Sequence, residues 1–213
     1  MYMITHLLFD LDNCLYSASY GLEKRVSERL EKFISELLNI SMEESRETHI
    51  DLIQKRGYGT TIEWLLAEKG FIDIESYYEA INPEDEADSL PPDPGLDNFL
   101  SSIHLPKAVL TNSTMVHAER ILNKLGIKKH FNHIFDIRFN NFKGKPHKGA
   151  FLRALEVMGA DLSSTLFIDD YPEYVAGYLR IGGRALLLDE FDNHSNLPYE
   201  RIRNLRELEF HLN

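Results

Sequence analysis

The chain has 213 residues, of which 43% are hydrophobic and 27% are charged, the balance of a folded globular protein. Its formal net charge of −11 argues against binding to nucleic-acid polymers, because such binding needs a basic surface. Cys14 is the only cysteine, so a disulfide framework is excluded, and no apolar run is long enough to cross a bilayer. Residues 1–10 lack the features of a signal peptide, which favours a cytoplasmic protein that has no membrane partner.

The first predicted element is a short buried strand over residues 5–10, which ends at the acidic residue Asp10. Residues 20–81 then show the periodicity of amphipathic helices. Ser41 and Glu44 have the spacing of a capping box, so the second of these helices is expected to begin there. Two shorter helices are expected after it, near residues 62–69 and 74–81.

A different pattern begins after residues 82–95, a stretch with four prolines that is predicted to be a linker. Beyond it, short apolar runs alternate with helical segments, which is typical of a doubly wound α/β fold with a parallel sheet. Strands are expected at residues 107–111, 133–137, 166–169 and 185–188, and helices at residues 113–125, 148–158 and 171–181. We therefore predict a Rossmann-like α/β core formed by residues 1–16 and 91–213, with an all-helical cap domain inserted as residues 17–90.

Polar residues stand where the predicted strands end, and the carboxyl ends of parallel strands meet at the edge where such sheets bind ligands. They are Asp10 and Asp12, Thr111 and Asn112, Asp169 and Asp170, together with Lys145 just before a helix. Crowded carboxylates need a cation, and oxygen ligands without clustered histidine or cysteine indicate Mg²⁺ rather than zinc. The set fits phosphoryl transfer, in which one carboxylate attacks phosphorus and a second moves protons.

Three other features show weaker patterns. His130 and His133 are three residues apart, but they lie beside the start of a strand, so we do not expect them to bind a metal. His117 is expected to be a partly exposed residue on the helix that follows Thr111. Cys14 is expected to be a small buried apolar side chain.

The order of the motifs, Asp-x-Asp, Thr-Asn, Lys-Pro and Asp-Asp, resembles that of the haloacid dehalogenase superfamily of hydrolases over essentially the whole chain. The segments FDLDNCLY, RGYGTT and KPHKGAF followed by FIDD are further similar to the pyrimidine 5′-nucleotidase branch. The resemblance implies that Asp10 is the nucleophile and a Mg²⁺ ligand, and that Asp12 is the general acid and base, with its main-chain carbonyl on the metal. It also implies that Asp170 binds Mg²⁺ directly and Asp169 through water.

For the phosphate, the resemblance implies that Thr111 and the amide of Asn112 hold its oxygens, and that Lys145 pairs with both the nucleophile and the phosphate. The family usually has threonine where this chain has Cys14, which bears on the fine positioning of the first motif. Residues at a predicted turn in the inserted helical stretch are candidates for contacting the substrate: Lys55, Arg56 and Tyr58.

We therefore expect a Mg²⁺-dependent phosphatase for a small phosphorylated metabolite, in particular a pyrimidine nucleoside 5′-monophosphate, acting as a monomer or homodimer. The alternatives are a phosphatase for a phosphosugar or phosphoglycolate, a haloacid dehalogenase, and a non-catalytic phosphoacceptor module. A dehalogenase needs neither Asp12 nor the acidic pair, and a phosphoacceptor module carries its acidic pair before the threonine and has no helical insert.

Overall fold

The computed structural model describes residues 3–54 and 57–212, and the chain divides into two compact units. One unit consists of residues 1–20 and 90–213, and the other of residues 21–89. The sequence predicts the two boundaries between these units after residues 16 and 90, and the structure has them after residues 20 and 89. In the part of the chain that the structure describes, no helix is both long enough and apolar enough to span a membrane.

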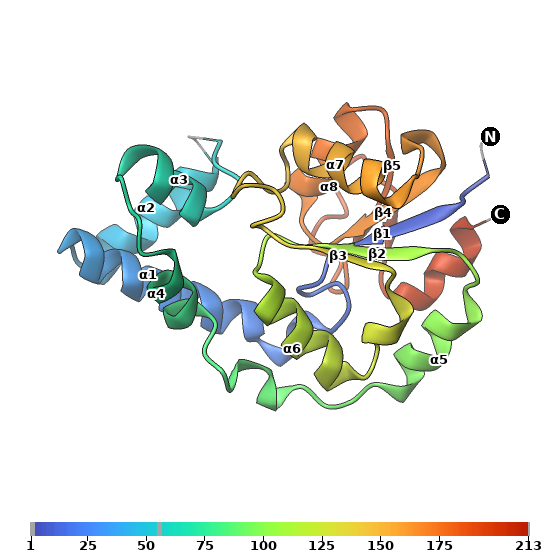
Figure 1. Ribbon diagram of the computed structural model, residues 1–213, viewed down its shortest axis with the longest axis horizontal. Coiled ribbons are helices and arrows are strands. Elements are labelled where there is room, and N and C mark those ends of the chain that lie inside the picture. Colours follow the sequence, from blue (N-terminus) through green and yellow to red (C-terminus); the bar gives the residue numbers. More distant parts are fainter. Residues whose placement is uncertain (1–2, 55–56, 213) are drawn as a thin grey trace. The chain divides into compact units, whose positions relative to one another are not determined.

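The larger unit is built on a six-stranded sheet in which all neighbouring strands are parallel, with the order β3-β2-β1-β4-β5-β6 (Figure 1). The strands are β1 (His6–Phe9), β2 (Lys107–Leu110), β3 (His133–Phe135), β4 (Thr165–Asp169), β5 (Arg184–Leu188) and β6 (Arg201–Ile202). The chain runs outward from β1 to β3 and then returns to the other side of β1 with β4. The predicted doubly wound parallel α/β sheet is therefore confirmed, and the reversal beside β1 marks the edge where such sheets bind ligands.

Helices cover both faces of this sheet, with α7 and α8 on one face and α5 and α6 on the other (Figure 1). Their bounds are α5 (Pro94–Ser102), α6 (Met115–Leu125), α7 (Lys148–Met158) and α8 (Pro172–Arg180). On the face of α7 and α8, three buried aromatic rings meet with their centroids 5.1–5.3 Å apart. They are Phe151 of α7, Tyr178 of α8 and Phe167 of β4, and they fix these helices on the strand that carries Asp169.

The segment predicted as a linker, residues 82–95, contains the beginning of a helix, so that prediction is wrong in part. Helix α5 begins at Pro94, and the side chain of Asp93 caps it by accepting a hydrogen bond of 2.9 Å from the amide of Leu96. Proline is well tolerated in the first turn of a helix because it needs no amide hydrogen there. The short 3-10 helices of this unit are at Ala18–Tyr20, Lys128–His130, Leu162–Ser164 and Leu205–His211.

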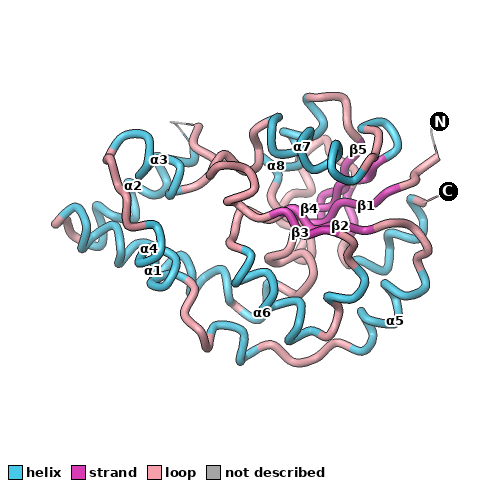
Figure 2. The backbone as a smooth tube through the Cα atoms, viewed as in Figure 1, coloured by secondary structure: helices cyan, strands magenta, loops and turns pink. Residues whose placement is uncertain are grey.

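The described residues of the smaller unit form helices joined by loops, with no strand among them (Figure 2). It contains α1 (Leu22–Leu38), α2 (Met42–Gln54), α3 (Thr61–Glu68), α4 (Ile74–Ile81) and a 3-10 turn at Glu86–Ser89. The predicted capping box is confirmed, because the amide of Ser41 donates to Glu44 Oε2 and the amide of Glu44 donates to Ser41 Oγ, at 2.8 and 3.2 Å. Phe33 packs edge-to-face on Phe71 and Tyr77, which joins α1 to α4 and to the loop that precedes α4.

Candidate active site

Three neighbouring strands bring the polar residues of the larger unit to one edge. In the parallel register, Phe9 of β1 lies beside Val109 of β2 and Ile168 of β4. The next residues along the three strands are Asp10, Leu110 with Thr111 after it, and Asp169, and the amide of Asp10 donates to the carbonyl of Ile168 at 2.8 Å. Backbone pairing of the strands therefore brings Asp10, Thr111 and Asp169 to the same edge of the sheet.

Lys145 connects two of these acidic residues from inside the protein. Its Nζ lies 2.6 Å from Asp10 Oδ1 and 2.6 Å from Asp169 Oδ2, and its side chain is fully buried. The same Nζ also lies over the face of the Tyr174 ring, 4.9 Å from the ring centroid. Although burial favours the neutral amine, the two carboxylates raise the pKa of Lys145 above its usual value, so the side chain is an ammonium ion.

One ammonium ion does not balance the carboxylates around it. Burial first, and then the neighbouring Asp169, raises the pKa of Asp10 to about 8 despite the attraction of Lys145. The pKa of Asp169 is also raised, chiefly by burial. Both carboxylates therefore lack sufficient positive charge in their surroundings, which is the condition that a bound cation relieves.

A third carboxylate completes a group that fits a divalent cation. Oxygen atoms of Asp10, Asp169 and Asp170 all lie within 4.8 Å of one another, and no other group of potential metal-binding side chains of this kind occurs among the described residues. Carboxylates alone are the ligands of a hard cation such as Mg²⁺, which keeps open positions for water and phosphate. Asp170 is oriented from outside the group by Asn13, whose Nδ2 donates to Asp170 Oδ2 at 3.3 Å.

The side chain of Asp12 is held by partners that the sequence does not reveal. Tyr16 donates its hydroxyl to Asp12 Oδ1 at 2.7 Å, His117 Nε2 lies 2.8 Å from the same oxygen, and Ser113 Oγ lies 3.2 Å from Oδ2. Burial opposes ionisation, but His117, followed by Tyr16 and Ser113, keeps the pKa of Asp12 below its usual value. The structure therefore places an ionised second carboxylate beside the Asp10 cluster.

The expectation that His117 is partly exposed is wrong, because only 2% of its area is accessible. Thr114 caps helix α6 and its hydroxyl accepts a hydrogen bond from the amide of His117, which puts this histidine in the first turn of the helix. From there the ring reaches the end of β1. Its place three residues after a capping threonine is the only local signal in the sequence, and it does not show which way the ring faces.

Asn112 and Thr111 use their side chains within the protein. Asn112 Nδ2 donates to the carbonyl of Lys145 at 2.9 Å, and Asn112 Oδ1 accepts from the amide of Lys145 at 2.8 Å. The neighbouring Gly144 leaves room for this pair, since a Cβ atom there would lie 2.0 Å from Asn112 Oδ1. Thr111 Oγ1 accepts a hydrogen bond of 3.0 Å from the amide of Ser113, which shapes the loop between β2 and α6. Asn112 thus ties Lys145 to the end of β2, a role that the motif pattern did not predict.

The candidate substrate residues belong to the smaller unit. Lys55 and Arg56 lie outside the described residues. Tyr58 is described, and its hydroxyl donates to Glu68 Oε1 at 2.8 Å within that unit. Their proposed contact with substrate stays a prediction.

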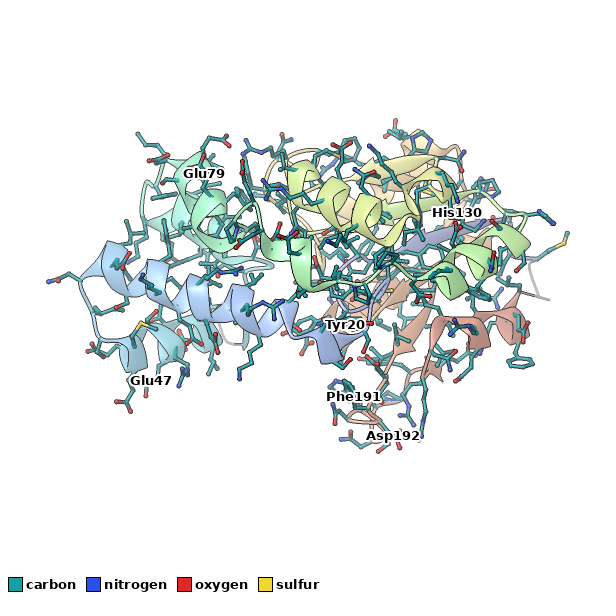
Figure 3. All side chains as sticks on the ribbon, turned by 90° about the horizontal axis from the view of Figure 1, so that it is seen from below. Tyr20, Glu47, Glu79, His130, Phe191 and Asp192 are labelled. Atoms are coloured by element: carbon teal, nitrogen blue, oxygen red, sulfur yellow. The ribbon has the colours of Figure 1, made fainter. Side chains whose placement is uncertain are left out.

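The two histidines after α6 make separate contacts within the protein. His130, labelled in Figure 3, lies with its Nε2 2.6 Å from Asp97 Oδ1, and Lys129 Nζ lies 2.8 Å from the same carboxylate oxygen. The ring of His133 instead stacks on Phe135 at a centroid distance of 5.6 Å. Both residues precede or begin β3, so they lie at the amino edge of the sheet, opposite the carboxylate cluster.

Cys14 is expected to resist alkylation in the native protein. Its side chain is buried as predicted, its Sγ donates to the carbonyl of Ile168 at 3.7 Å, and burial, followed by the charge of Asp10, raises its pKa well above the usual value. Because the thiolate is the reactive form, iodoacetamide at pH 8 should label the unfolded chain far faster than the native one. Mass spectrometry with and without urea measures this, and equal rates would contradict the buried, protonated thiol.

Comparisons with known proteins concern the family and the fold of the chain. Residues 4–177 match the family model of haloacid dehalogenase-like hydrolases. The structure is similar to YfnB from Bacillus subtilis in a form bound to magnesium, with 21% identity, a TM-score of 0.67 and 99% of each chain covered. It is also similar to a HAD phosphatase from Thermococcus onnurineus, with 19% identity, a TM-score of 0.66 and 98% of each chain covered. L-2-haloacid dehalogenase from Xanthobacter autotrophicus matches with 13% identity, a TM-score of 0.62 and 97% of each chain covered. At these identities the structural likenesses show the fold.

Proposed function

The chain belongs to the haloacid dehalogenase-like hydrolase family, and on this premise we propose that it is a Mg²⁺-dependent phosphatase for a small phosphomonoester. The observation that supports the proposal most directly is the group formed by Asp10, Asp169 and Asp170, with Lys145 bridging the first two. The three carboxylates are buried or partly buried, and Asp10 and Asp169 are short of positive charge. Such a group accepts a divalent cation and a phosphate together, because each relieves the charge of the other.

The side chains of Asp10 and Asp170 would hold Mg²⁺ directly, the main-chain carbonyl of Asp12 would be a further ligand, and Asp169 would act through water. The bound cation would neutralise the carboxylates and part of the charge on the phosphate oxygens. Lys145 keeps Asp10 in place and adds a positive charge close to the transferring group. With the cation bound, Mg²⁺ and Lys145 together would form a small cationic pocket within an acidic protein.

In the first step, a carboxylate oxygen of Asp10 attacks phosphorus while the bond from phosphorus to the leaving oxygen breaks. Asp12, which is ionised in the free protein, takes up a proton as the phosphomonoester monoanion binds and gives it to that leaving oxygen. In the second step, Asp12 takes a proton from water, the water oxygen bonds to phosphorus, and the Asp10 carboxylate is released. Thr111 and the main-chain amide of Asn112 would hold the phosphate oxygens through both steps.

We further propose that the leaving group is a pyrimidine nucleoside, with a phosphosugar or phosphoglycolate as the alternative substrate. The resemblance of the segments FDLDNCLY, RGYGTT and KPHKGAF to the pyrimidine 5′-nucleotidase branch supports a nucleotide substrate. The helical unit of residues 21–89 would act as a cap that selects the leaving group, since its sequence interrupts the α/β unit directly after the first motif. The presence of Asp12 and of the acidic pair favours phosphate chemistry over dehalogenation, which needs neither.

A screen for phosphate release over nucleotides and sugar phosphates tests the proposal, with Mg²⁺ or with EDTA. We expect many turnovers of p-nitrophenyl phosphate and of at least one natural ester with Mg²⁺, and only background release in EDTA. Full activity in the chelator would contradict the metal-assisted mechanism. A single turnover per protein molecule would instead indicate a phosphoacceptor module, and halide release from 2-chloropropionate would indicate a dehalogenase.

A further inference from the structure

The two carboxylate oxygens of Asp12 have different surroundings. Two groups converge on Oδ1, the hydroxyl of Tyr16 at 2.7 Å and Nε2 of His117 at 2.8 Å. Among the described residues, Ser113 Oγ is the hydrogen-bond partner of Oδ2, at the longer distance of 3.2 Å. Of the Asp12 side chain, 28% is accessible, whereas only 2% of His117 is, so the carboxylate can meet a substrate while the imidazole cannot.

We propose that His117 is a positioning residue, which together with Tyr16 holds Oδ1 of Asp12 so that Oδ2 exchanges the proton with the leaving group. The inference rests on the proposed phosphatase function and deepens it. Oδ1 lies within hydrogen-bond distance of both the Tyr16 hydroxyl and Nε2 of His117 and accepts from both, so Nε2 is the protonated nitrogen of the imidazole. Both lone pairs of Oδ1 are then occupied, and a proton that arrives at Asp12 binds to Oδ2.

Ser113 fits the same assignment because a hydroxyl can reverse its direction. It donates to Oδ2 when Asp12 is ionised and accepts from Oδ2 when Asp12 carries the proton, simply by rotating its hydrogen. A protonated imidazole nitrogen has no such freedom and stays a donor in both states. His117 therefore fixes the orientation of Asp12 throughout the cycle, while Ser113 follows the proton.

The position of His117 is rigid, which a positioning role requires. The residue lies in the capped first turn of α6, and the following turns of that helix are anchored in the core by Ala118, Ile121 and Leu122, all fully buried. Proton transfer in the transition state is sensitive to the placement of the acid, so loss of this contact should matter most where the leaving oxygen needs the proton.

The leaving group supplies a readout that a structural role would not move. A nitrophenolate leaves without a proton, whereas an alkoxide does not, so the slope of log kcat/KM against the pKa of the leaving group reports the function of Asp12. For His117→Leu we expect kcat/KM to fall by about 10²-fold or more for an alkyl phosphate and by less than about tenfold for p-nitrophenyl phosphate. His117→Gln, which keeps a donor at the position of Nε2, should recover most of the loss for the alkyl ester.

Two further variants complete the experiment. His130→Gln is the matched control, because it alters a histidine–aspartate pair of similar geometry at the opposite edge of the sheet, and its kcat/KM should equal that of the wild type for every ester. Asp12→Asn should steepen the slope as His117→Leu does, and the double variant should lose no more than Asp12→Asn alone.

Two results would overturn the inference while leaving the proposed function intact. One is a loss in His117→Gln, the variant expected to fold normally, that is as large as in His117→Leu and equal for alkyl and nitrophenyl esters. The other is a double variant whose losses simply multiply. Absence of Mg²⁺-dependent phosphate release from the wild-type protein would instead overturn the proposed function itself.

Discussion

Replacement of Asp10 by asparagine is expected to abolish turnover while the protein remains folded. The amide has nearly the same shape as the carboxylate, but it is a poor nucleophile for phosphorus and a poor ligand for Mg²⁺. Phosphate release should fall to the background measured in EDTA, for activated and unactivated esters alike. Retention of a sizeable part of wild-type activity would show that Asp10 is not the nucleophile.

The same variant has an expected effect on stability, with a definite sign. The pKa of Asp10 is raised to about 8 in the folded protein, against about 4 in an unfolded chain. The folded state therefore binds the proton more tightly, and ionisation costs stability progressively as the pH rises from about 4 to 8. Asp10→Asn removes this cost, so in EDTA its advantage in the free energy of unfolding over the wild type should grow from pH 5 to pH 8.

Asp97 offers a matched control with the opposite sign. Hydrogen bonds from Lys129 and then His130 lower its pKa, so this carboxylate stabilises the folded state above its unfolded pKa, and the contribution is lost as the pH falls. Asp97→Asn should therefore lose stability at pH 8 relative to pH 4. Urea unfolding of both variants in EDTA at several pH values makes the measurement. A destabilised Asp10→Asn at pH 8 would contradict the excess of negative charge at the cluster.

Replacement of Lys145 by methionine is expected to abolish activity and also to destabilise the protein. Methionine fills the buried space, but Asp10 and Asp169 then face each other without the ammonium ion that bridges them. Removal of one partner from a buried ion pair typically costs about 3–5 kcal/mol. We expect a loss of this order in EDTA, and a partial recovery when Mg²⁺ is added, since a bound cation restores positive charge to the carboxylates.

Two neighbouring lysines and one double variant test this explanation. Lys143 and Lys148 are exposed, so their replacement by methionine should leave activity and stability nearly unchanged. Asp10→Asn combined with Lys145→Met should be more stable than Lys145→Met alone, because one of the two unpaired charges is gone. If Lys145→Met retains full stability, or if the double variant is the less stable protein, the bridge is not what balances the carboxylates.

The juxtaposition of the acidic residues with Thr111 was predictable because it follows from local features. A short apolar run that ends in an acid identifies a buried parallel strand, and parallel strands bring their carboxyl ends to one edge. Asp10, Thr111 and Asp169 therefore meet wherever the sheet forms. The start of α5 was missed although Asp93 and Pro94 are ordinary helix-start residues, because the prolines around them dominate the local pattern. Strand β6 has only two residues, and pairing with β5 defines it.

The contacts that orient the candidate catalytic groups were decided by tertiary structure alone. His117 and Asp12 are 105 residues apart, and Asn112 and Lys145 are 33 apart. Periodicity indicates which face of α6 is apolar, but the direction of the His117 ring depends on how that helix is rotated and shifted against β1. That placement is set by the packing of many side chains across the sheet, each with its own volume, and the residues within one segment carry no information about it. The sequence thus determined which groups meet, and packing determined which atoms of those groups touch.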